Sequence, residues 1–431
     1  MNPIDAVLIS TNDVRGGAAK CAARLHDALP GVGVRSRLLV ANRARSEPDI
    51  LEYNPVAPAP RALGRLVFRL ARRLYRPSVR RTGGFFSFDR APIGRRLLGQ
   101  LPPCDLVNLH FVADLFDPRL LPHLAEAVPV VWTLHDMNPF TGGCHYSDGC
   151  ERYTAGCGSC PQLRLSDGPR DLTHRCLARK RSALERVSAE RFAVVASSRW
   201  MAAAAGRSSL LGRFDVHHIP SGVDTEDFRP MPRDQARRRF GLPEDARIAL
   251  FVAEVVSDRR KGLQLLPAAA EAAADLPGTL FVTIGQGAAG ENFRHLGSLR
   301  DTESLRAAYS AADVFVLPSL EDNFPNTMIE AMACGTPVVG FATGGIPDAV
   351  HDGATGLLAP TGDGAALAAQ VRRVLAHQGL RRSLGCEARY LVEQEYNIHL
   401  HARRYATLYE QMLGEQAAVG RKKEARGALA A

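Results

Sequence analysis

The stretch from Leu317 to Leu358 constrains the fold of this chain most, because strand, loop and helix signals follow one another there in a fixed order. A hydrophobic strand is stopped by Pro318, and a polar, acidic loop then leads into a short helix that Gly335 ends. A second hydrophobic strand runs into a glycine-rich turn at residues 343–345. This order is typical of a βαβ unit in an open α/β sheet, whose ligands bind at the carboxyl ends of the strands.

The loop before this helix combines two features that suit a nucleotide sugar. The helix N-terminus offers backbone amides to a phosphate, and the carboxylates of Asp322 and Glu330 can accept hydrogen bonds from sugar and ribose hydroxyls. An ordinary βαβ unit with acidic helix caps is the alternative explanation of the same pattern.

Length and composition set the class of protein. A chain of 431 residues is too long for one core, so we expect two α/β domains. No apolar run reaches the ~20 residues that span a bilayer, and the opening MNPIDAVLIS is typical of a strand and not of a signal peptide. We therefore expect a cytoplasmic protein with reduced thiols. The net charge of +9 predicts an anionic partner: a nucleotide, a lipid headgroup or a nucleic acid.

Two strand ends in the first half carry candidate site residues. The turn TNDVRGG ends in Gly16 and Gly17 between a predicted strand and a predicted helix, where glycines let backbone amides approach an anion. His135 ends another predicted strand, where it can hydrogen-bond a sugar hydroxyl or transfer a proton. Both patterns have a structural alternative, and we interpret the strand-end His110 as structural.

Residues 61–82, RALGRLVFRLARRLYRPSVRRT, predict a basic amphipathic helix, because leucines recur at helical spacing and arginines occupy the other faces. Such a helix suits an anionic membrane surface. A solvated helix packed on its own domain and a nucleic-acid contact remain the alternatives. Our hypothesis is peripheral contact with the inner face of the cell membrane.

The loop PFTGGCHYSDGCERYTAGCGSCPQL, residues 139–163, holds four of the nine cysteines. These are Cys144, Cys150, Cys157 and Cys160. Four thiolates, the last two spaced as C-x-x-C, can complete a tetrahedral zinc site, and four sulfur ligands leave no position open for catalysis. We therefore predict a structural zinc ion, with disulfides or free thiols as alternatives.

The second half repeats the strand–turn–helix order after a cluster of glycine and proline near residue 222. In the turn SDRRKG, Arg260 and Lys261 could hold a diphosphate by charge-assisted hydrogen bonds, or they could be solvated surface cations. We predict a first domain over 1–221 and a second over 222–396. A helix over 397–414 would cross back onto the first domain, and a disordered tail would follow over 415–431.

Apart from its tail and residues 55–85, the chain resembles glycosyltransferase family 4, retaining enzymes of the GT-B fold that use nucleotide-sugar donors. The resemblance rests on PSLEDNFPNTMIEAMACGTPVVGF, GGIPDAV and GATGLL. The segments HDMNPFTGGCHYSDGC and GCGSCPQL are similar to those of the subgroup that acts in exopolysaccharide and colanic-acid assembly. The resemblance implies an α/β fold of the GT-B type, with two Rossmann-like domains facing a central cleft.

In the second domain, the resemblance implies that Glu330 binds the nucleotide ribose and that Lys261 holds the diphosphate. Asp322 stands where the family has a longer carboxylate, and Glu321 could replace it through a shift of one residue. Arg260 is the candidate for a positive charge that the family carries earlier, at Ala253-Glu254 in this chain. The expected substrate contacts of this domain are Arg260, Glu321, Asn323, Phe324, Asn326, Thr327 and Glu330.

In the first domain, the resemblance matches His135 to the active-site histidine and Gly16 and Gly17 to the donor-side loop. We accordingly expect His135, Asp322 and Lys261 to be the catalytic residues. The implied reaction moves a sugar from a nucleotide-diphosphate sugar to a hydroxyl of a glycan or lipid-linked acceptor in bacterial surface polysaccharide biosynthesis. The acceptor attacks from the face that the diphosphate leaves, and no cofactor or catalytic metal is expected.

Two other functions remain open. Another GT-B enzyme, such as a nucleotide-sugar epimerase, would convert the donor without an acceptor. A basic, zinc-containing nucleic-acid binder would account for the charge and the four cysteines but would leave residues 317–358 unexplained. We therefore expect no nucleic-acid partner.

Overall fold

The computed structural model describes residues 3–74, 85–87, 96–163, 168–287, 290 and 292–429. The chain divides into two compact units. Unit 1 comprises Met1–Ile219 and His401–Ala431, and unit 2 comprises Pro220–Leu400. In these ranges, no helix has both the length and the apolar character that crossing a membrane requires.

Unit 1 is built on a parallel sheet of seven strands in the order β3-β2-β1-β4-β5-β6-β7. The strands are β1 (Ile4–Asn12), β2 (Val34–Asn42), β3 (Ile50–Glu52), β4 (Leu106–Leu109), β5 (Val130–Leu134), β6 (Phe192–Ala196) and β7 (Val216–His218). Every residue of β4, β5 and β6 is buried, which requires a layer of helices on each face of the sheet.

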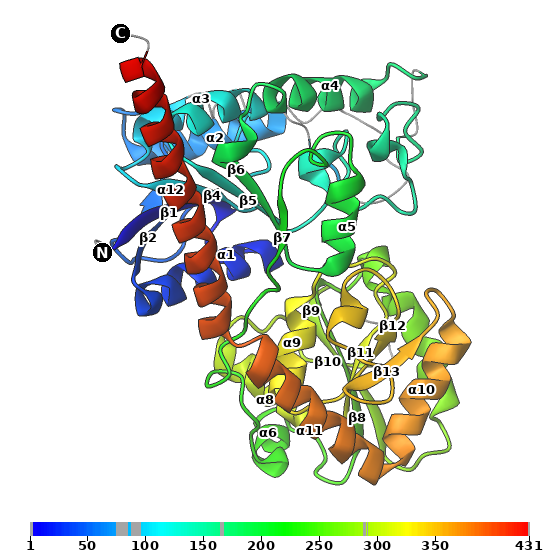
Figure 1. Cartoon of the computed structure of the whole chain (residues 1–431). Helices are drawn as coiled ribbons and strands as arrows, with labels where there is room; N and C mark the ends of the chain where they lie inside the picture. Colours follow the sequence, from blue (N-terminus) through cyan, green and yellow to red (C-terminus); the bar gives the residue numbers. More distant parts are fainter. Residues whose placement is uncertain are drawn as a thin grey trace. The chain divides into compact units, whose positions relative to one another are not determined.

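Alternate residues of β1 enter different cores: Val7 and Ile9 face one, and Ala6 and Leu8 the other. The first core also takes side chains from α2 (Arg61–Leu74), α3 (Leu121–Ala127), α4 (Leu172–Leu184) and α5 (Arg199–Arg207). The second takes them from α1 (Gly17–Ala28) and α12 (Ile398–Leu429). The two termini of the chain therefore contribute to one core, as the long α12 beside the sheet in Figure 1 shows.

Buried hydrogen bonds accompany the packing of α12. The hydroxyl of Tyr405 lies 2.9 Å from that of Thr133, and the hydroxyl of Tyr409 accepts from the amide of Asn108 at 2.8 Å. The helix continues to Leu429, through most of the segment for which the sequence indicates a disordered tail. That segment is rich in Ala, Glu, Lys and Arg, which have high helix propensity.

Unit 2 has a parallel sheet of six strands in the order β10-β9-β8-β11-β12-β13. The strands are β8 (Arg247–Val255), β9 (Thr279–Gln286), β10 (Arg294–His295), β11 (Val314–Leu317), β12 (Val338–Phe341) and β13 (Gly356–Ala359). One core packs against α6 (Arg233–Arg239), α8 (Thr302–Ala311), α9 (Asn326–Ala333) and α11 (Gln378–Glu395). The other packs mainly against α7 (Leu266–Ala272) and α10 (Gly364–Ala376).

The prediction of two Rossmann-like α/β sheets is thus confirmed. The central strands at 314–317 and 338–341 have the predicted limits, and the helix between them begins one residue earlier than predicted, at Asn326. Of the predicted basic helix, α2 covers 61–74, and residues 75–82 lie outside the described residues.

Candidate active site

Loops that leave neighbouring strands at the same edge of the sheet form the candidate site of unit 2. β8 and β11 pair in parallel, with Leu250 opposite Phe315. The turn after β8 ends at Gly262, whose φ is 79°, and a Cβ there would lie 1.9 Å from the carbonyl oxygen of Pro318. Only glycine allows this approach. The amide of Leu320 then donates to the carbonyl of Arg260 at 2.8 Å, which ties the two loops together.

Two cations from the first loop surround one carboxylate of the second. Lys261 Nζ lies 2.5 Å from Asp322 Oδ2, and Arg260 Nη1 lies 3.4 Å from the same oxygen. The hydroxyl of Ser319 donates to this oxygen at 3.2 Å. Arg260 also donates to the backbone carbonyl of Glu321 at 2.7 Å, which fixes its guanidinium near the pair.

The cluster is an ion pair that is largely shielded from water: the side chain of Asp322 is 7% exposed, and those of Lys261 and Arg260 are 24% exposed. Burial by itself raises the pKa of Asp322, but the charges of Lys261 and Arg260 outweigh it and hold that pKa below its usual value. Burial lowers the pKa of Lys261, and the attraction of Asp322 only partly offsets it. Arg260 also lies 3.6 Å from the carboxylate of Asp258, so the two cations are held by carboxylates that an anionic ligand can replace as partners.

The glycine-rich turn after β12 contacts the backbone of Asp322. Gly344 has a φ of 55°, and a Cβ on it would lie 1.7 Å from the carbonyl oxygen of Asp322. The amide of Gly345 donates to the same oxygen at 3.1 Å. This turn therefore fixes the backbone that carries the buried carboxylate, and the positive φ and close contact of Gly344 explain why glycine stands at that position.

Glu330 lies on α9 and is 1% exposed. Its Oε2 accepts a hydrogen bond from the hydroxyl of Tyr309 on α8 at 2.9 Å. Tyr309 is itself fully buried, so the two helices share a buried polar contact that the sequence did not indicate.

The other predicted loop residues divide by exposure. Asn323 is 2% exposed, and the ring of Phe324 packs against that of Tyr396 at 5.3 Å between centroids. The partly exposed ones are Glu321, Asn326 and Thr327, of which the last two begin α9. Arg260 and Lys261 are likewise partly exposed, with 24% of each side chain accessible.

In unit 1, two histidines meet where β4 and β5 end. Nδ1 of His110 lies 3.0 Å from Nε2 of His135. Burial lowers the pKa of His135 to about 4, against the attraction of Asp136, and burial also lowers that of His110 well below its usual value. Both imidazoles are therefore neutral at pH 7, and His135 can donate or accept a hydrogen bond but carries no charge.

A second buried chain of hydrogen bonds lies beside this pair and was not predicted. Asp136 Oδ2 is 2.7 Å from His145 Nδ1, and His145 Nε2 is 2.9 Å from the hydroxyl of Ser87. Backbone hydrogen bonds between 85–87 and 143–145 hold these residues in place. The proximity of His110 to His135 could have been inferred from their neighbouring strands, but no local pattern links Ser87 to His145.

Gly16 and Gly17 occupy the predicted turn at the start of α1. Gly16 is the N-cap residue with a φ of 91°, and its carbonyl accepts from the amide of Lys20 at 3.1 Å. The first turn of α1 carries no acidic side chain. The predicted loop therefore has the backbone form that an anion-binding helix end requires.

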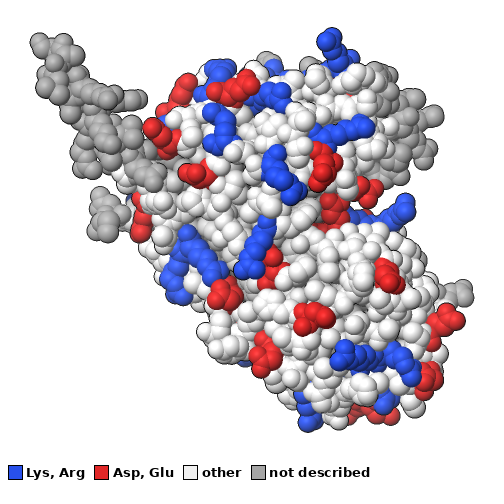
Figure 2. Space-filling model, turned by 45° about the vertical axis from the view of Figure 1, so that its right-hand side comes forward, with Lys and Arg blue, Asp and Glu red and all other residues white. Residues whose placement is uncertain are grey.

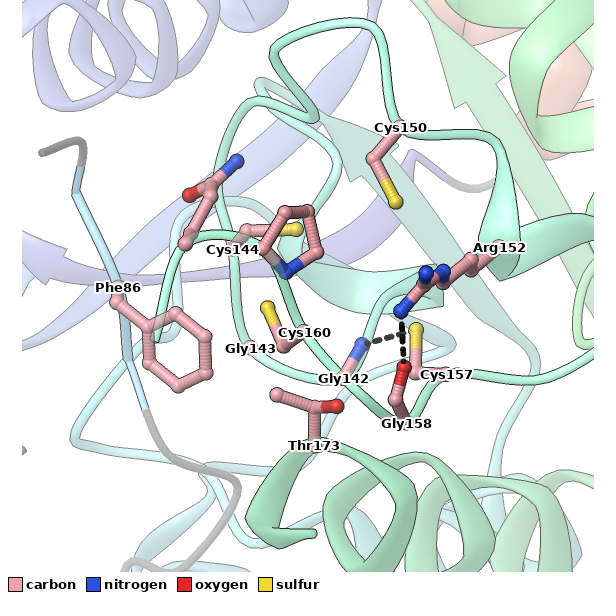
Figure 3. A pocket seen from close by; sticks show the side chains of 12 residues that line it. Phe86, Gly142, Gly143, Cys144, Cys150, Arg152, Cys157, Gly158, Cys160 and Thr173 are labelled. Atoms are coloured by element: carbon pink, nitrogen blue, oxygen red, sulfur yellow. Dashed lines mark hydrogen bonds between the residues drawn. The ribbon is translucent and has the colours of Figure 1, made fainter. Parts of the chain in front are cut away.

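The four cysteines of the 139–163 loop lie around one hollow in unit 1 (Figure 3), and all are free thiols. Across the described part of the chain, no three His, Cys, Asp or Glu side chains are placed as ligands of a metal ion. The predicted zinc site thus remains a prediction.

The structure brings Arg260, Lys261 and Asp322 together in unit 2, and it pairs His135 with His110 in unit 1. Glu330 belongs to the same strand–helix unit as Asp322, and its carboxylate accepts a hydrogen bond from Tyr309.

Two family profiles match this chain in succession. Residues 15–227 match the family described as "Glycosyltransferase Family 4", and residues 246–377 match "Glycosyl transferases group 1". Together they include every predicted site residue of both units.

Curated relatives share part of the chain. The D-inositol 3-phosphate glycosyltransferase of Geodermatophilus obscurus is 38% identical over 193 residues, which are 39% of this chain and 43% of that protein. The enzyme of the same name from Salinispora arenicola is 34% identical over 236 residues, which are 48% of this chain and 52% of that protein. The chain therefore spans about half, or less, of the length of these relatives.

Solved structures match over nearly the whole chain. The sucrose-phosphate synthase of Thermosynechococcus elongatus superposes with a TM-score of 0.66 at 23% identity, covering 95% of this chain and 99% of that one. HepE of Anabaena, solved with UDP and glucose, superposes with a TM-score of 0.64 at 16% identity, covering 95% of this chain and 100% of that one. WaaG, a glycosyltransferase involved in lipopolysaccharide biosynthesis, superposes with a TM-score of 0.58 at 17% identity, covering 94% of this chain and 99% of that one. The chain belongs to the group 1 and family 4 glycosyltransferases and has their GT-B fold.

Proposed function

We propose that this chain is a retaining glycosyltransferase. It would transfer a sugar from a nucleotide-diphosphate sugar to a hydroxyl of a glycan or lipid-linked acceptor in bacterial surface polysaccharide biosynthesis. The observation that carries the proposal is the cluster of Lys261, Arg260 and Asp322 at the edge of the unit 2 sheet, four residues before α9 begins.

In this proposal the diphosphate of the donor binds Lys261 and Arg260, which in the structure contact the carboxylates of Asp322 and Asp258. As the bond from the sugar to the diphosphate breaks, negative charge develops on the leaving oxygen. Cations already in place stabilise this charge without further reorganisation, and one such contact is typically worth about 3–4 kcal/mol of the barrier.

The remaining residues bind and orient. Glu330 would accept hydrogen bonds from the ribose, and the partly exposed Glu321, Asn326 and Thr327 would contact the rest of the donor. Asp322 keeps the lysine in position, and His135, neutral at pH 7, would hydrogen-bond a sugar hydroxyl. The proton of the attacking hydroxyl would pass to the leaving diphosphate, so that no residue of the protein has to act as a nucleophile.

The relatives support a nucleotide-sugar donor. HepE was also solved in complex with UDP-glucose, and its fold matches over 95% of this chain. The curated relatives are named for inositol 3-phosphate, which makes a phosphorylated polyol the acceptor to test against a glycan or lipid-linked one.

A donor screen tests the proposed function. We expect one of the UDP-, GDP- or ADP-sugars to stabilise the protein by about 2.7 kcal/mol at 100 times its Kd, which raises Tm by roughly 5–10 °C. The same donor should then label an acceptor with retention of anomeric configuration. If no nucleotide sugar shifts Tm and none is consumed with any acceptor, the proposal is wrong; donor conversion without acceptor would indicate an epimerase.

We also propose that α2 of unit 1 contacts an anionic membrane surface. Leu63, Leu66 and Leu70 follow one another along one face of the helix and are 46%, 47% and 50% exposed. Phe68, which is 3% exposed, attaches another face to the core. Exposed arginines stand on the remaining face, and one of them, Arg65, pairs with Glu52 at 2.6 Å. Solvent-facing leucines flanked by arginines are more typical of a helix at a lipid interface than of a helix that is surrounded by water.

The membrane contact predicts that the triple substitution Leu63→Ser, Leu66→Ser and Leu70→Ser abolishes most co-sedimentation with vesicles containing anionic lipid. Tyr390→Ser is the matched control, because Tyr390 is 61% exposed but lies in unit 2. The control should sediment like the unmodified protein. Equal sedimentation of the triple variant would show that the leucines bind no lipid.

Nothing on the visible surface favours the nucleic-acid alternative. Among the described residues of each unit on the face shown in Figure 2, Lys and Arg side chains are interspersed with Asp and Glu and do not form a continuous basic track. Non-specific nucleic-acid binding depends on such a track.

A further inference from the structure

Four cysteine side chains from different parts of the 139–163 loop meet at one hollow in unit 1. Cys144, Cys150, Cys157 and Cys160 line a space of about 320 Å³, part of which is open to solvent. Figure 3 shows the four side chains directed into this space. Five residues lie between Cys144 and Cys150 and two between Cys157 and Cys160, so the loop must reverse direction to bring the four side chains to one hollow.

Left-handed residues next to each cysteine produce these reversals. Gly143 (φ 141°) precedes Cys144, and Gly149 (φ 76°) precedes Cys150. Between the last two cysteines, Gly158 has a φ of 150° and Ser159 a φ of 46°. Ser159 is a non-glycine residue in the left-handed region, which is uncommon and requires that its surroundings hold it there.

Close backbone approach brings the two arms of the loop together. A Cβ on Gly142 would lie 2.9 Å from the Cβ of Cys157 and 2.5 Å from the carbonyl oxygen of Thr173, so a larger residue does not fit. The amide of Gly142 donates to the sulfur of Cys157 at 3.2 Å. An amide that points at a cysteine sulfur favours the thiolate form, which is the form that binds metals.

Two cations of the protein are placed to balance a doubly negative tetrathiolate–zinc unit. Lys180, 3% exposed on α4, donates to the carbonyl of Thr141 at 3.0 Å, three residues before Cys144. Arg152 lines the hollow and donates to the carbonyl of Gly158 at 2.8 Å. A zinc ion with four thiolates carries a net charge of −2, which these two side chains match.

We propose that Cys144, Cys150, Cys157 and Cys160 bind one structural zinc ion in unit 1. The sulfurs have to turn toward a common point in the space that they already line, and such a rotation is a small cost beside the free energy of zinc binding. The bound ion would fix a loop that contains only short 3₁₀ turns at 138–140 and 152–154. The same loop carries His145, which holds Asp136 next to His135.

Metal analysis of tag-free protein, purified without chelator, tests this site whether or not the protein transfers sugar. We expect about one zinc per chain, with X-ray absorption showing four sulfur ligands at about 2.3 Å. The variant Cys157→Ser should retain much less zinc than the unmodified protein, because it removes one of the four sulfur ligands. Cys104→Ser, a unit 1 cysteine outside the hollow, should keep it.

Three results would overturn the zinc assignment. The first is unmodified protein that contains no metal and has nine reactive thiols. The second is two disulfides within residues 144–160, found by mass spectrometry. The third is the absorption spectrum of an iron–sulfur cluster in place of zinc. The measurements on unmodified protein decide the question even if Cys157→Ser does not fold.

Discussion

Replacing Lys261 by alanine is expected to lower kcat by about 10²–10³. The variant removes the cation closest to Asp322 and, in the proposed reaction, the one that stabilises charge on the departing diphosphate. It also leaves the buried carboxylate of Asp322 without its lysine, although Arg260 and Ser319 still contact it. Loss of one member of a buried ion pair can cost about 3–5 kcal/mol of folding free energy, so activity and stability have to be measured on the same samples.

The double variant Lys261→Ala with Asp322→Asn separates the two effects. Removing both charges removes the unpaired carboxylate, so the urea unfolding midpoint should recover most of what the single variant loses. Its kcat should stay low, because the cation that faces the leaving group is still missing. If the double variant regained kcat along with stability, Lys261 would be a structural residue only.

Replacing Glu330 by alanine is expected to lower kcat/KM for the donor by about 10²–10⁴, since each charge-assisted hydrogen bond to a ribose hydroxyl contributes roughly 1.5–3 kcal/mol. From the sequence alone we would expect the fold to be unaffected. The structure predicts instead an additional loss of about 1–3 kcal/mol of stability, because the fully buried hydroxyl of Tyr309 loses its acceptor.

Tyr309→Phe is the matched control for this variant. It removes the same hydrogen bond within the protein but keeps the carboxylate of Glu330, so we expect reduced thermal stability with donor KM within a few-fold of the original. Donor titration by isothermal calorimetry gives the affinity of each variant directly. Unchanged donor affinity in Glu330→Ala would exclude Glu330 from the ribose site.

Local sequence patterns predicted the architecture well, because each strand, turn and helix of a parallel α/β sheet has a recognisable pattern within a short segment. The buried strands are short, mainly hydrophobic runs that end at a polar or glycine turn, as at 192–196 and 338–341. The turns at Gly16-Gly17 and Gly344-Gly345 were recognised for the same reason, since a positive φ at Gly16 or Gly344 restricts which residue can stand there. The eighteen-residue α11 was not predicted, because its buried residues are few and arginines interrupt its apolar pattern.

The sequence by itself determined that two Rossmann-like sheets form, which loops end at their carboxyl edges, and which loop carries the four cysteines. Only the tertiary structure decided which polar groups pair: Lys261 with Asp322, Tyr309 with Glu330, His110 with His135, and Ser87 with His145. These partners lie 61, 21, 25 and 58 residues apart. Periodicity reports which face of an element is buried, whereas a contact between two loops depends on strand order and register, and those arise only when the whole sheet assembles.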